Sequence, residues 1–308
     1  MAYFYDLTLG LPHTNHRGLS EPLLLKHAGH FQWMSIAAAT GGPLSRLRTA
    51  SGGEVYAAFY YIEERLPPAT PLESFRLDNE VRFAIELRSF KNIAVEGRVV
   101  FDRPERLSDR ARVEALLAPD ATDVPHPFIR FGNIFVTPVI GNSVLRVAPP
   151  ASADFSGLTP LPNDDNPYHL TRAGSDGRGL GVLDDRWLPA GSFEHCYRID
   201  VDRDTNGAGL VYFANYATFM ETAERLALGE LALALPVQPE RLGRRSLAHR
   251  RIAYYGNADV SDTIDVRVTV LRDPASPLSL GFRYAIERRE DGQTICLSEA
   301  VKVIPPQP

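Results

Sequence analysis

The pattern of apolar and polar positions is similar in the two halves of the chain. In the second half, alternation over residues 193–201 predicts a strand, and apolar residues at helical spacing over 210–235 predict one long helix. Alternating runs predict further strands at 247–255, 263–272, 278–288 and 294–304. Asp291-Gly292, between the last two runs, is typical of a hairpin turn. The second half therefore has the order strand, long helix, antiparallel sheet.

The first half repeats this order. Residues 3–9 predict a strand, residues 12–17 a turn, and residues 18–40 a helix that tolerates Pro22 in its first turn. Further strands are predicted at 54–63, 79–87, 92–101, 111–117 and 128–139. A short motif also recurs before the two helices: Asn15-x-x-Gly18-Leu19 and Asn206-x-x-Gly209-Leu210. The same motif at the same junction indicates a duplicated unit.

A stretch rich in proline and glycine, residues 148–189, separates the two halves, and we expect little regular structure there. One helix wrapped by a curled antiparallel sheet is the hot-dog arrangement. Two of them in tandem make a double hot-dog, which belongs to the α+β class. We predict a first hot-dog domain at 1–148, a crossover linker at 149–190 and a second hot-dog domain at 191–308.

Composition and charge narrow the class of protein. The 308 residues carry 44% apolar side chains and a net charge of −5, which excludes a largely disordered chain. The acidic balance also argues against nucleic acid or an anionic membrane as partner. Cys196 and Cys296 are too few for a disulfide framework or a thiolate zinc site. With no signal peptide or membrane-length apolar run visible, we expect a soluble, cytoplasmic protein.

One segment resembles the signature of hot-dog acyl-CoA thioesterases of the hydroxybenzoyl-CoA and acyl-carrier-associated type. Their pattern Asp-x-Asp-x-x-Gly-x-Val-Tyr-x-x-Asn-Tyr stands here as residues 204–216, Asp-x-Asn-x-x-Gly-x-Val-Tyr-Phe-Ala-Asn-Tyr. Asn206 occupies the position of that family's catalytic aspartate. An amide donates hydrogen bonds but does not activate water, so the resemblance implies thioester binding without the usual hydrolytic carboxylate. Asn15, its counterpart in the first half, is also an amide.

The whole chain resembles the double hot-dog bifunctional acyltransferase/decarboxylases of polyketide pathways, the leinamycin-pathway type. The motifs that carry this resemblance are Gly-Leu-Pro-His at 10–13, Gly-Leu-Ser-Glu at 18–21, Leu-Leu-Lys at 24–26, Gly-His at 29–30 and Val-Tyr-Ala-Ala-Phe at 55–59. The resemblance implies that a malonyl-type thioester, methylmalonyl-CoA in that family, is decarboxylated and transferred to an acyl carrier protein. It further implies an acyl-O-tyrosine intermediate, for which Tyr56 is the match by position, with Tyr60 and Tyr61 as alternatives.

The chemistry suits amide donors, because an attacked thioester carbonyl and a decarboxylating malonyl group both place negative charge on the thioester oxygen. Gly18 and Gly209 are expected to open the two helices and present backbone N–H groups, unless they serve turn geometry alone. Asn15 and Asn206 would add side-chain donors, unless they only cap the helices. The predicted catalytic set is Tyr56, Asn206, Gly209, His13, Asn15 and Gly18.

The remaining candidates are predicted to bind substrate or to favour the phenolate. A tyrosine nucleophile needs a nearby cation or base, and His13, His16, Arg17 and His30 are the nearest in sequence. Ser20 and Glu21 stand at the helix start, as capping residues or as substrate contacts. Two basic clusters, Arg46 with Arg48 and residues 241–251, are candidates for CoA phosphates or for the acidic face of a carrier protein. The predicted substrate-binding set is His16, Ser20, Glu21, Tyr60, Arg250 and Arg251.

Three other functions stay open at this point. A thioesterase would need a base elsewhere, for instance Glu21 or Glu221. A hot-dog dehydratase would need His13 or His16 to meet Glu221, and a carrier-binding scaffold would need no chemistry. No bound cofactor is expected, since the CoA thioester is the substrate, and the partner is an acyl carrier protein with its phosphopantetheine arm. His27 and His30 share a helix face without a third ligand, so no metal is predicted; a homodimer is left open.

Overall fold

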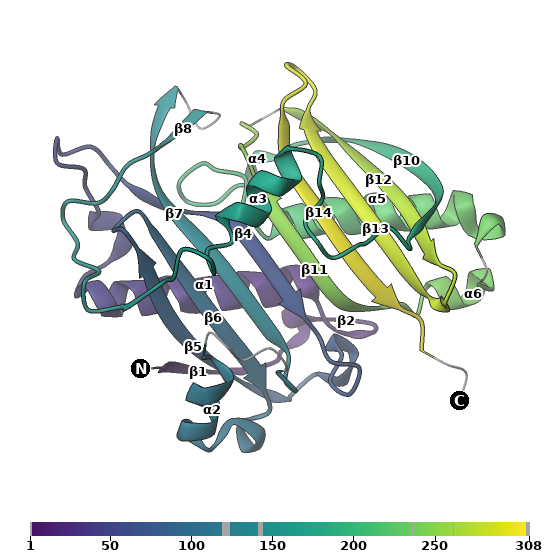
Figure 1. Cartoon of the computed structure of the whole chain (residues 1–308), viewed down its shortest axis with the longest axis horizontal. Coiled ribbons are helices and arrows are strands. Elements are labelled where there is room, and N and C mark those ends of the chain that lie inside the picture. Colours follow the sequence, from purple (N-terminus) through teal and green to yellow (C-terminus); the bar gives the residue numbers. More distant parts are fainter. Residues whose placement is uncertain (1, 119–123, 141–143, 236, 261, 306–308) are drawn as a thin grey trace. The chain divides into compact units, whose positions relative to one another are not determined.

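The structure is a computed structural model that describes residues 2–118, 124–140, 144–235, 237–260 and 262–305. Its described part divides into two units. Unit 1 comprises Met1–Val139 and Leu145–Pro167, and unit 2 comprises Ile140–Val144 and Tyr168–Pro308. Each unit contains one long helix and an antiparallel sheet (Figure 1).

The sheet of unit 1 has the strand order β1-β5-β6-β7-β4, all antiparallel. These strands are β1 (Ala2–Thr8), β4 (Tyr56–Arg65), β5 (Glu80–Phe90), β6 (Ala94–Asp102) and β7 (Phe128–Ile140). The helices are α1 (Glu21–Thr40) and α2 (Arg110–Leu116), with single 3-10 turns at Leu11–His13, Leu44–Arg46, Leu72–Ser74 and Pro104–Leu107. Short strands complete the unit: β2 (Thr14–Asn15), β3 (Gly18–Leu19), β8 (Val144–Val147) and β9 (Thr159–Pro160).

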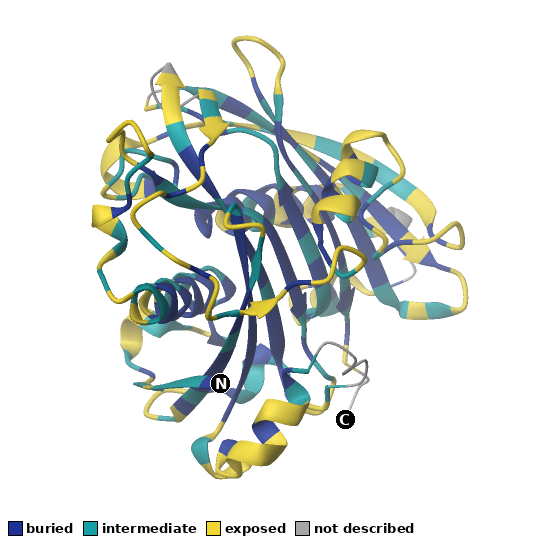
Figure 2. Cartoon of the chain, turned by 60° about the vertical axis from the view of Figure 1, so that its left-hand side comes forward, coloured by how far each residue is buried: buried dark blue, intermediate teal, exposed yellow. Residues whose placement is uncertain are grey.

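The long helix α1 ends at Gly41, whose φ of 72° is the left-handed conformation that glycine adopts at helix C-termini. Its buried side packs on the sheet through aromatic rings, with Phe31 and Phe83 at 5.2 Å and Trp33 and Phe59 at 5.7 Å between ring centroids. In Figure 2 the buried residues are concentrated in the long helices and the strands, and the connecting loops are mostly exposed.

A buried amide pair joins the middle of α1 to the sheet. The Gln32 amide nitrogen donates to Asn133 Oδ1 on β7, and both residues are fully buried. Gly97 on β6 leaves room for this amide, because a Cβ there would lie 1.8 Å from Gln32 Oε1 and would displace the Gln32 side chain. Helix and sheet are therefore in direct contact at mid-helix.

Unit 2 repeats this architecture with the strand order β10-β12-β13-β14-β11. The strands are β10 (Leu188–Arg198), β11 (Ser246–Tyr254), β12 (Thr263–Asp273), β13 (Ser276–Arg288) and β14 (Thr294–Val303). The central helix is α5 (Asn215–Leu231), extended by a 3-10 turn at Ala232–Ala234. Shorter helices are α3 (Tyr168–Ser175), α4 (Val201–Asp204) and α6 (Pro239–Leu242). Phe219 of α5 packs on Tyr197 of β10, with ring centroids 4.6 Å apart.

Three predictions from the sequence need correction. Residues 111–117 form helix α2 instead of a strand, because the Asp109 carboxylate accepts from the N–H groups of Ala111 and Arg112 and starts a helix. Both long helices begin later than predicted, at Glu21 and Asn215. The stretch 148–189 also contains α3 and β9, and β9 pairs with β5.

Candidate functional site

The turn before α5 is built around the Asn206 side chain. Its Oδ1 accepts from the N–H groups of Ala208 at 2.9 Å and Leu210 at 3.2 Å. The Asn206 N–H donates to the Leu210 carbonyl at 2.8 Å, and the Gly209 N–H to the Asn206 carbonyl at 2.9 Å. Because the side-chain oxygen faces the turn, the Nδ2 group faces away from it, with no hydrogen-bond partner among the described residues.

Asp204, two residues earlier, anchors this turn. Its buried carboxylate accepts from the Tyr197 hydroxyl at 2.8 Å and the Asp200 N–H at 2.9 Å. Its carbonyl accepts from Tyr212 N and from Asn215 Nδ2 at the start of α5. Burial, followed by this hydrogen bond, raises the pKa of Tyr197 to about 12. The Asp204 carboxylate is thus occupied by structural contacts.

The first unit carries a matching turn before α1. Asn15 Oδ1 accepts from the N–H groups of Arg17 at 2.8 Å and Gly18 at 3.3 Å. The Nδ2 group of Asn15 again faces away from the turn and has no hydrogen-bond partner among the described residues. The repeated motif therefore places one side-chain amide N–H group in the turn that precedes the central helix of each unit.

The prediction that Gly18 and Gly209 present free N–H groups at helix starts is wrong. The Gly18 N–H bonds to Asn15 Oδ1, and the Gly209 N–H bonds to the Asn206 carbonyl. Gly18 has φ of 148°, and a Cβ there would lie 2.8 Å from both Glu73 Cα and the Leu72 carbonyl oxygen. The turn-geometry role is the one that the structure supports for Gly18.

His13 lies beside the start of α1, in the segment of residues 10–21 that we call the entrance of unit 1. Its Nδ1 accepts from the Gly10 N–H at 2.7 Å, which leaves the proton of the neutral ring on Nε2. The His13 ring meets His27 of α1 edge to face at 4.7 Å between centroids. Burial lowers the pKa of His27, and the neighbouring His13 and His30 lower it further. His13 and His27 therefore form an imidazole pair that the sequence analysis did not propose.

Three other predicted residues lie at the same end of unit 1. Ser20 is the N-cap of α1, but its side chain makes no capping hydrogen bond; its N–H bonds to the His13 carbonyl at 3.0 Å. Glu21, the first residue of α1, is buried, and His16 is exposed. The structure thus brings His13, Asn15, Ser20 and Glu21 to one end of the unit.

Tyr56 lies away from this end. It is the first residue of β4, and Phe59, three residues further along, contacts Trp33 in the second half of α1. The opposite end of β4 leads to the segment 72–75 that touches Gly18 and Leu19. The Tyr56 hydroxyl donates to Glu54 at 2.9 Å, and this bond raises the pKa of Tyr56. The structure does not join Tyr56 to the histidines predicted to activate it.

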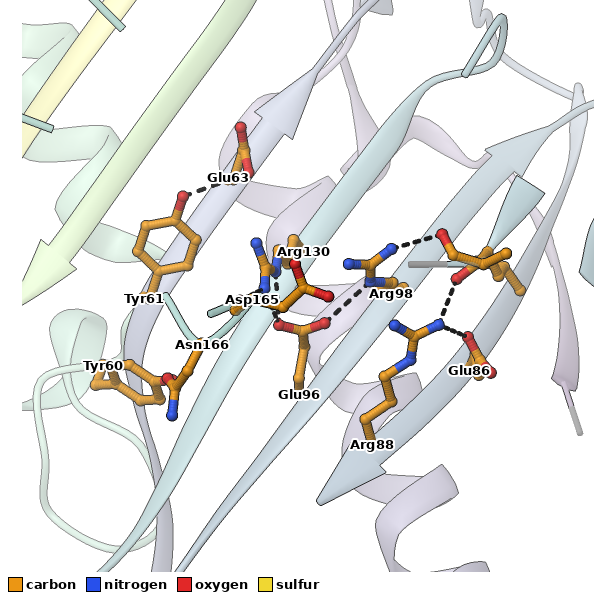
Figure 3. A network of polar contacts seen from close by, with 12 residues as sticks. Tyr60, Tyr61, Glu63, Glu86, Arg88, Glu96, Arg98, Arg130, Asp165 and Asn166 are labelled. Carbon is orange, nitrogen blue, oxygen red and sulfur yellow. Dashed lines mark hydrogen bonds and ion pairs between the residues drawn. The ribbon is translucent and has the colours of Figure 1, made fainter. Parts of the chain in front are cut away.

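Tyr60 and Tyr61 belong to a buried polar network on the sheet of unit 1 (Figure 3). The Tyr60 hydroxyl donates to Asn166 Oδ1 at 3.1 Å, and the Tyr61 hydroxyl to Glu63 at 3.3 Å. Burial and the Glu96 carboxylate raise the pKa of Tyr60. A raised pKa disfavours the phenolate that a tyrosine nucleophile needs.

Glu96 is the centre of the same network. It accepts from Arg98 Nε at 3.0 Å and Arg130 Nε at 2.6 Å, while Arg130 also donates to the Asp165 carbonyl (Figure 3). Asp165 and Asn166, in the middle of the crossover, are therefore held against the sheet of unit 1. A structural role accounts for these contacts.

The predicted phosphate ligand Arg250 needs correction. Its side chain is fully buried, with Nη1 3.8 Å from Met220 Sδ and the guanidinium 5.6 Å from the centre of the Tyr284 ring. A residue so placed does not meet a solvent-borne phosphate. Arg251 is half-buried, and its Nη1 donates to the carbonyls of Leu180 and Gly181.

The sequence did not mark two further acidic residues, Glu224 and Glu73, as site candidates. Glu224, on the buried side of α5, contacts Lys302, Arg245 and Tyr284. Glu73 lies in the 3-10 turn Leu72–Ser74 against Gly18, and its Oε2 is buried with no hydrogen-bond partner among the described residues. No local pattern marks either one, because both depend on contacts between segments distant in sequence.

Within the described residues, no group of His, Cys, Asp and Glu side chains is arranged to hold a metal ion. No described helix combines the length and apolar character that crossing a membrane requires.

Comparison with known proteins finds similarity only at the level of structure. No family model matches the sequence. No curated protein matches it either. A protein described as an oleoyl thioesterase from Lactobacillus plantarum shares 12% identity, with 100% of this chain and 97% of that chain covered and a TM-score of 0.64. The 12:0-ACP thioesterase from Umbellularia californica shares 8% identity, with 98% and 93% covered and a TM-score of 0.61.

An acyl-ACP thioesterase from Bacteroides thetaiotaomicron is similar over 98% of this chain and 97% of its own, at 9% identity and a TM-score of 0.55. At such identities the similarity establishes the fold. The chain has the double hot-dog fold of the α+β class, as the sequence predicted.

Proposed function

We propose that this protein is an enzyme that acts on acyl thioesters of coenzyme A or of an acyl carrier protein. The observation that carries the proposal is the pair of turns at Asn15 and Asn206, each of which holds an amide N–H group outward before a central helix. Such donors stabilise the negative charge that develops on a thioester oxygen. The names of the three structural neighbours, all described as thioesterases, support the substrate class.

For the reaction itself we propose decarboxylation and acyl transfer with a malonyl-type thioester, methylmalonyl-CoA being the substrate that the family resemblance implies. When the bond to the malonyl carboxylate breaks, carbon dioxide leaves, and the electron pair of that bond stays on the acyl group and forms an enolate. The enolate oxygen accepts a hydrogen bond from the Asn206 amide. No base is needed for this step. A carboxylate at position 206 would repel the substrate's own carboxylate, which makes an amide the better residue there. A proton from the solvent then adds to the enolate carbon and gives propionyl-CoA. The carrier's phosphopantetheine thiol attacks the propionyl carbonyl, the carbon–sulfur bond to CoA breaks, and the proton of the attacking thiol passes to the departing CoA thiolate. The products are propionyl-carrier and free CoA.

The acyl-O-tyrosine step is not included in this proposal. The Glu54 hydrogen bond raises the pKa of Tyr56, and Tyr56 lies beside the later turns of α1, away from Asn15. A covalent role for Tyr56 stays a prediction of the family resemblance alone.

Hydrolysis is the second candidate, because all three structural neighbours are described as thioesterases. Incubation with methylmalonyl-CoA and a phosphopantetheinylated carrier protein separates the two, with intact-mass analysis of the carrier. We expect a propionyl-loaded carrier. Free CoA with an unloaded carrier and free acid would favour hydrolysis, and unchanged substrate would contradict the proposed function.

A further inference from the structure

At the entrance of unit 1, a second segment, residues 72–76, packs against the turn before α1. The Leu19 N–H donates to the Phe75 carbonyl at 3.1 Å, and Arg76 Nη1 donates to the Arg17 carbonyl at 2.5 Å. Gly18 lies so close to this segment that a Cβ would stand 2.8 Å from Glu73 Cα. The 3-10 turn Leu72–Ser74 is thus fixed directly beside the Asn15–Gly18 turn.

Glu73 occupies the middle of that 3-10 turn. The residue as a whole is half-buried, but its Oε2 is buried and has no hydrogen-bond partner among the described residues. A buried carboxylate oxygen without a donor is unfavourable, and such groups in folded proteins call for a reason, catalysis among them. Asp204, which precedes the Asn206 turn of unit 2, is by contrast occupied by the Tyr197 hydroxyl and the Asp200 N–H.

We infer that Glu73 is the acid–base residue of the unit 1 entrance and acts on the same thioester carbonyl as the Asn15 amide. The inference rests on the proposed function and extends it to the proton transfer that acyl transfer requires. Two groups with complementary roles, an N–H donor for the oxyanion and a carboxylate for the proton, then lie on adjoining backbone turns.

The proton transfer takes place in two steps. As the oxygen of a water, or the sulfur of a carrier thiol, bonds to the acyl carbon, its proton moves to the Glu73 carboxylate. The carbonyl electron pair moves to oxygen, which accepts a hydrogen bond from Asn15 Nδ2. The carbon–sulfur bond to CoA then breaks as the carbonyl re-forms, and Glu73 returns the proton to the departing thiolate. Water gives the free acid, and the carrier thiol gives the loaded carrier.

The test measures steady-state turnover of propionyl-CoA by wild type, Glu73→Gln and Glu73→Ala, with and without carrier protein, and follows released CoA and the carrier's mass. We expect kcat to fall by about a hundredfold or more in both variants with KM nearly unchanged, as for loss of a general acid–base group. Added formate is expected to restore turnover in Glu73→Ala, an effect that a merely structural role would not produce. Glu80→Gln, which removes an exposed carboxylate at the start of β5, is the matched control.

The carrier's mass shows which acceptor the residue serves. If the Glu73 variants lose carrier loading, the acyl acceptor that Glu73 activates is the carrier thiol. If they lose formation of free acid, the acceptor is water. Either result supports the role of Glu73. Turnover of Glu73→Gln within about threefold of wild type would overturn the inference while leaving the proposed function intact. Absence of turnover in the wild type with every thioester would overturn both.

Discussion

Glu224 and Lys302 form an ion pair inside unit 2, with 2.9 Å between Glu224 Oε2 and Lys302 Nζ. Glu224 is fully buried on α5, and Lys302 on β14 is 3% exposed. The Tyr284 hydroxyl and Arg245 also bond to the carboxylate. The matching position in unit 1 is held by Gln32 and Asn133, because β7 and β14 take the same place in the strand order. In each unit a buried polar pair thus joins the central helix to the fourth strand of the sheet, β7 in unit 1 and β14 in unit 2.

The first prediction concerns the stability of unit 2. Lys302→Met removes one partner of a buried pair, so we expect the free energy of unfolding to fall by about 3–5 kcal/mol. Urea denaturation followed by circular dichroism measures it. The double variant Lys302→Met with Glu224→Gln is expected to lose less than Lys302→Met alone, since no buried carboxylate then lacks this partner.

The control removes an exposed ion pair of the same type. Arg267→Met breaks the contacts of Arg267 with Glu194 at 3.2 Å and with Glu287 at 3.8 Å; the Arg267 and Glu194 side chains are about half exposed. Exposed pairs contribute about 0–1 kcal/mol, so a small change is expected. If Lys302→Met cost no more than this control, the buried pair would not stabilise unit 2.

The second prediction is the response of unit 2 to acid. The buried cations Lys302 and Arg245 and the Tyr284 hydroxyl hold the pKa of Glu224 well below its usual value, against the effect of burial. In the unfolded chain a glutamate has a pKa of about 4.3. The unfolded state therefore takes up the proton first, and the stability from Glu224 is complete above about pH 5 and is lost as pH falls below it.

The dependence of stability on pH is measured from melting temperatures between neutral pH and pH 3. Glu224→Gln is expected to be less stable at neutral pH and to lose less stability on acidification than wild type. Glu230→Gln, an exposed position on the same helix, should keep the wild-type slope. An unchanged acid slope in Glu224→Gln would show that this carboxylate is not held ionised in the fold.

Much of the fold could be predicted from the sequence because it follows local rules. Alternation located β11 to β14 within two residues at each end, but it placed the start of β10 five residues late and extended it into α4; helical spacing located α1 and α5. The prediction of a strand at 111–117 was wrong because the Asp109 side chain caps helix α2 there. In so short a run, the spacing of apolar residues does not distinguish a helix from a strand. Strand order follows from pairing between distant segments, which no local pattern reports.

The candidate site could be predicted only in part, and for the same reason. The motif marked Asn15 and Asn206, since it recurs in sequence. The Gly18 and Gly209 N–H groups form hydrogen bonds within their own turns, and these bonds depend on the folded conformation of each turn. The burial of Arg250 depends on tertiary contacts alone.

The third prediction tests the Asn206 amide. Asn206→Asp keeps an oxygen that accepts from Ala208 and Leu210, so the turn is expected to persist, but it replaces the outward N–H donor with a negative charge. Decarboxylation of methylmalonyl-CoA is expected to slow by about a hundredfold to a thousandfold, the effect of losing one oxyanion donor. Carbon dioxide release measures the rate, and the near-ultraviolet circular dichroism spectrum reports on the fold.

Asn163→Asp, at an exposed position of the crossover, makes the same chemical change away from the turn and should leave the rate unaltered. Equal rates for Asn206→Asp and wild type would mean that Asn206 does not touch the reacting group. A gain of free acid in Asn206→Asp would show that a carboxylate at this position activates water.

The last prediction concerns Tyr56. Because the Glu54 hydrogen bond raises its pKa, the phenolate is scarce at neutral pH, and no predicted histidine lies beside it. We therefore expect Tyr56→Phe to load the carrier within about twofold of the wild-type rate. Peptide mass spectrometry of the acid-quenched wild-type reaction is expected to show no acyl group on Tyr56. An acylated Tyr56 peptide in the wild type, together with loss of loading in Tyr56→Phe, would instead establish the covalent intermediate that the family resemblance implies. It would place the transfer step at the far end of α1 from Asn15.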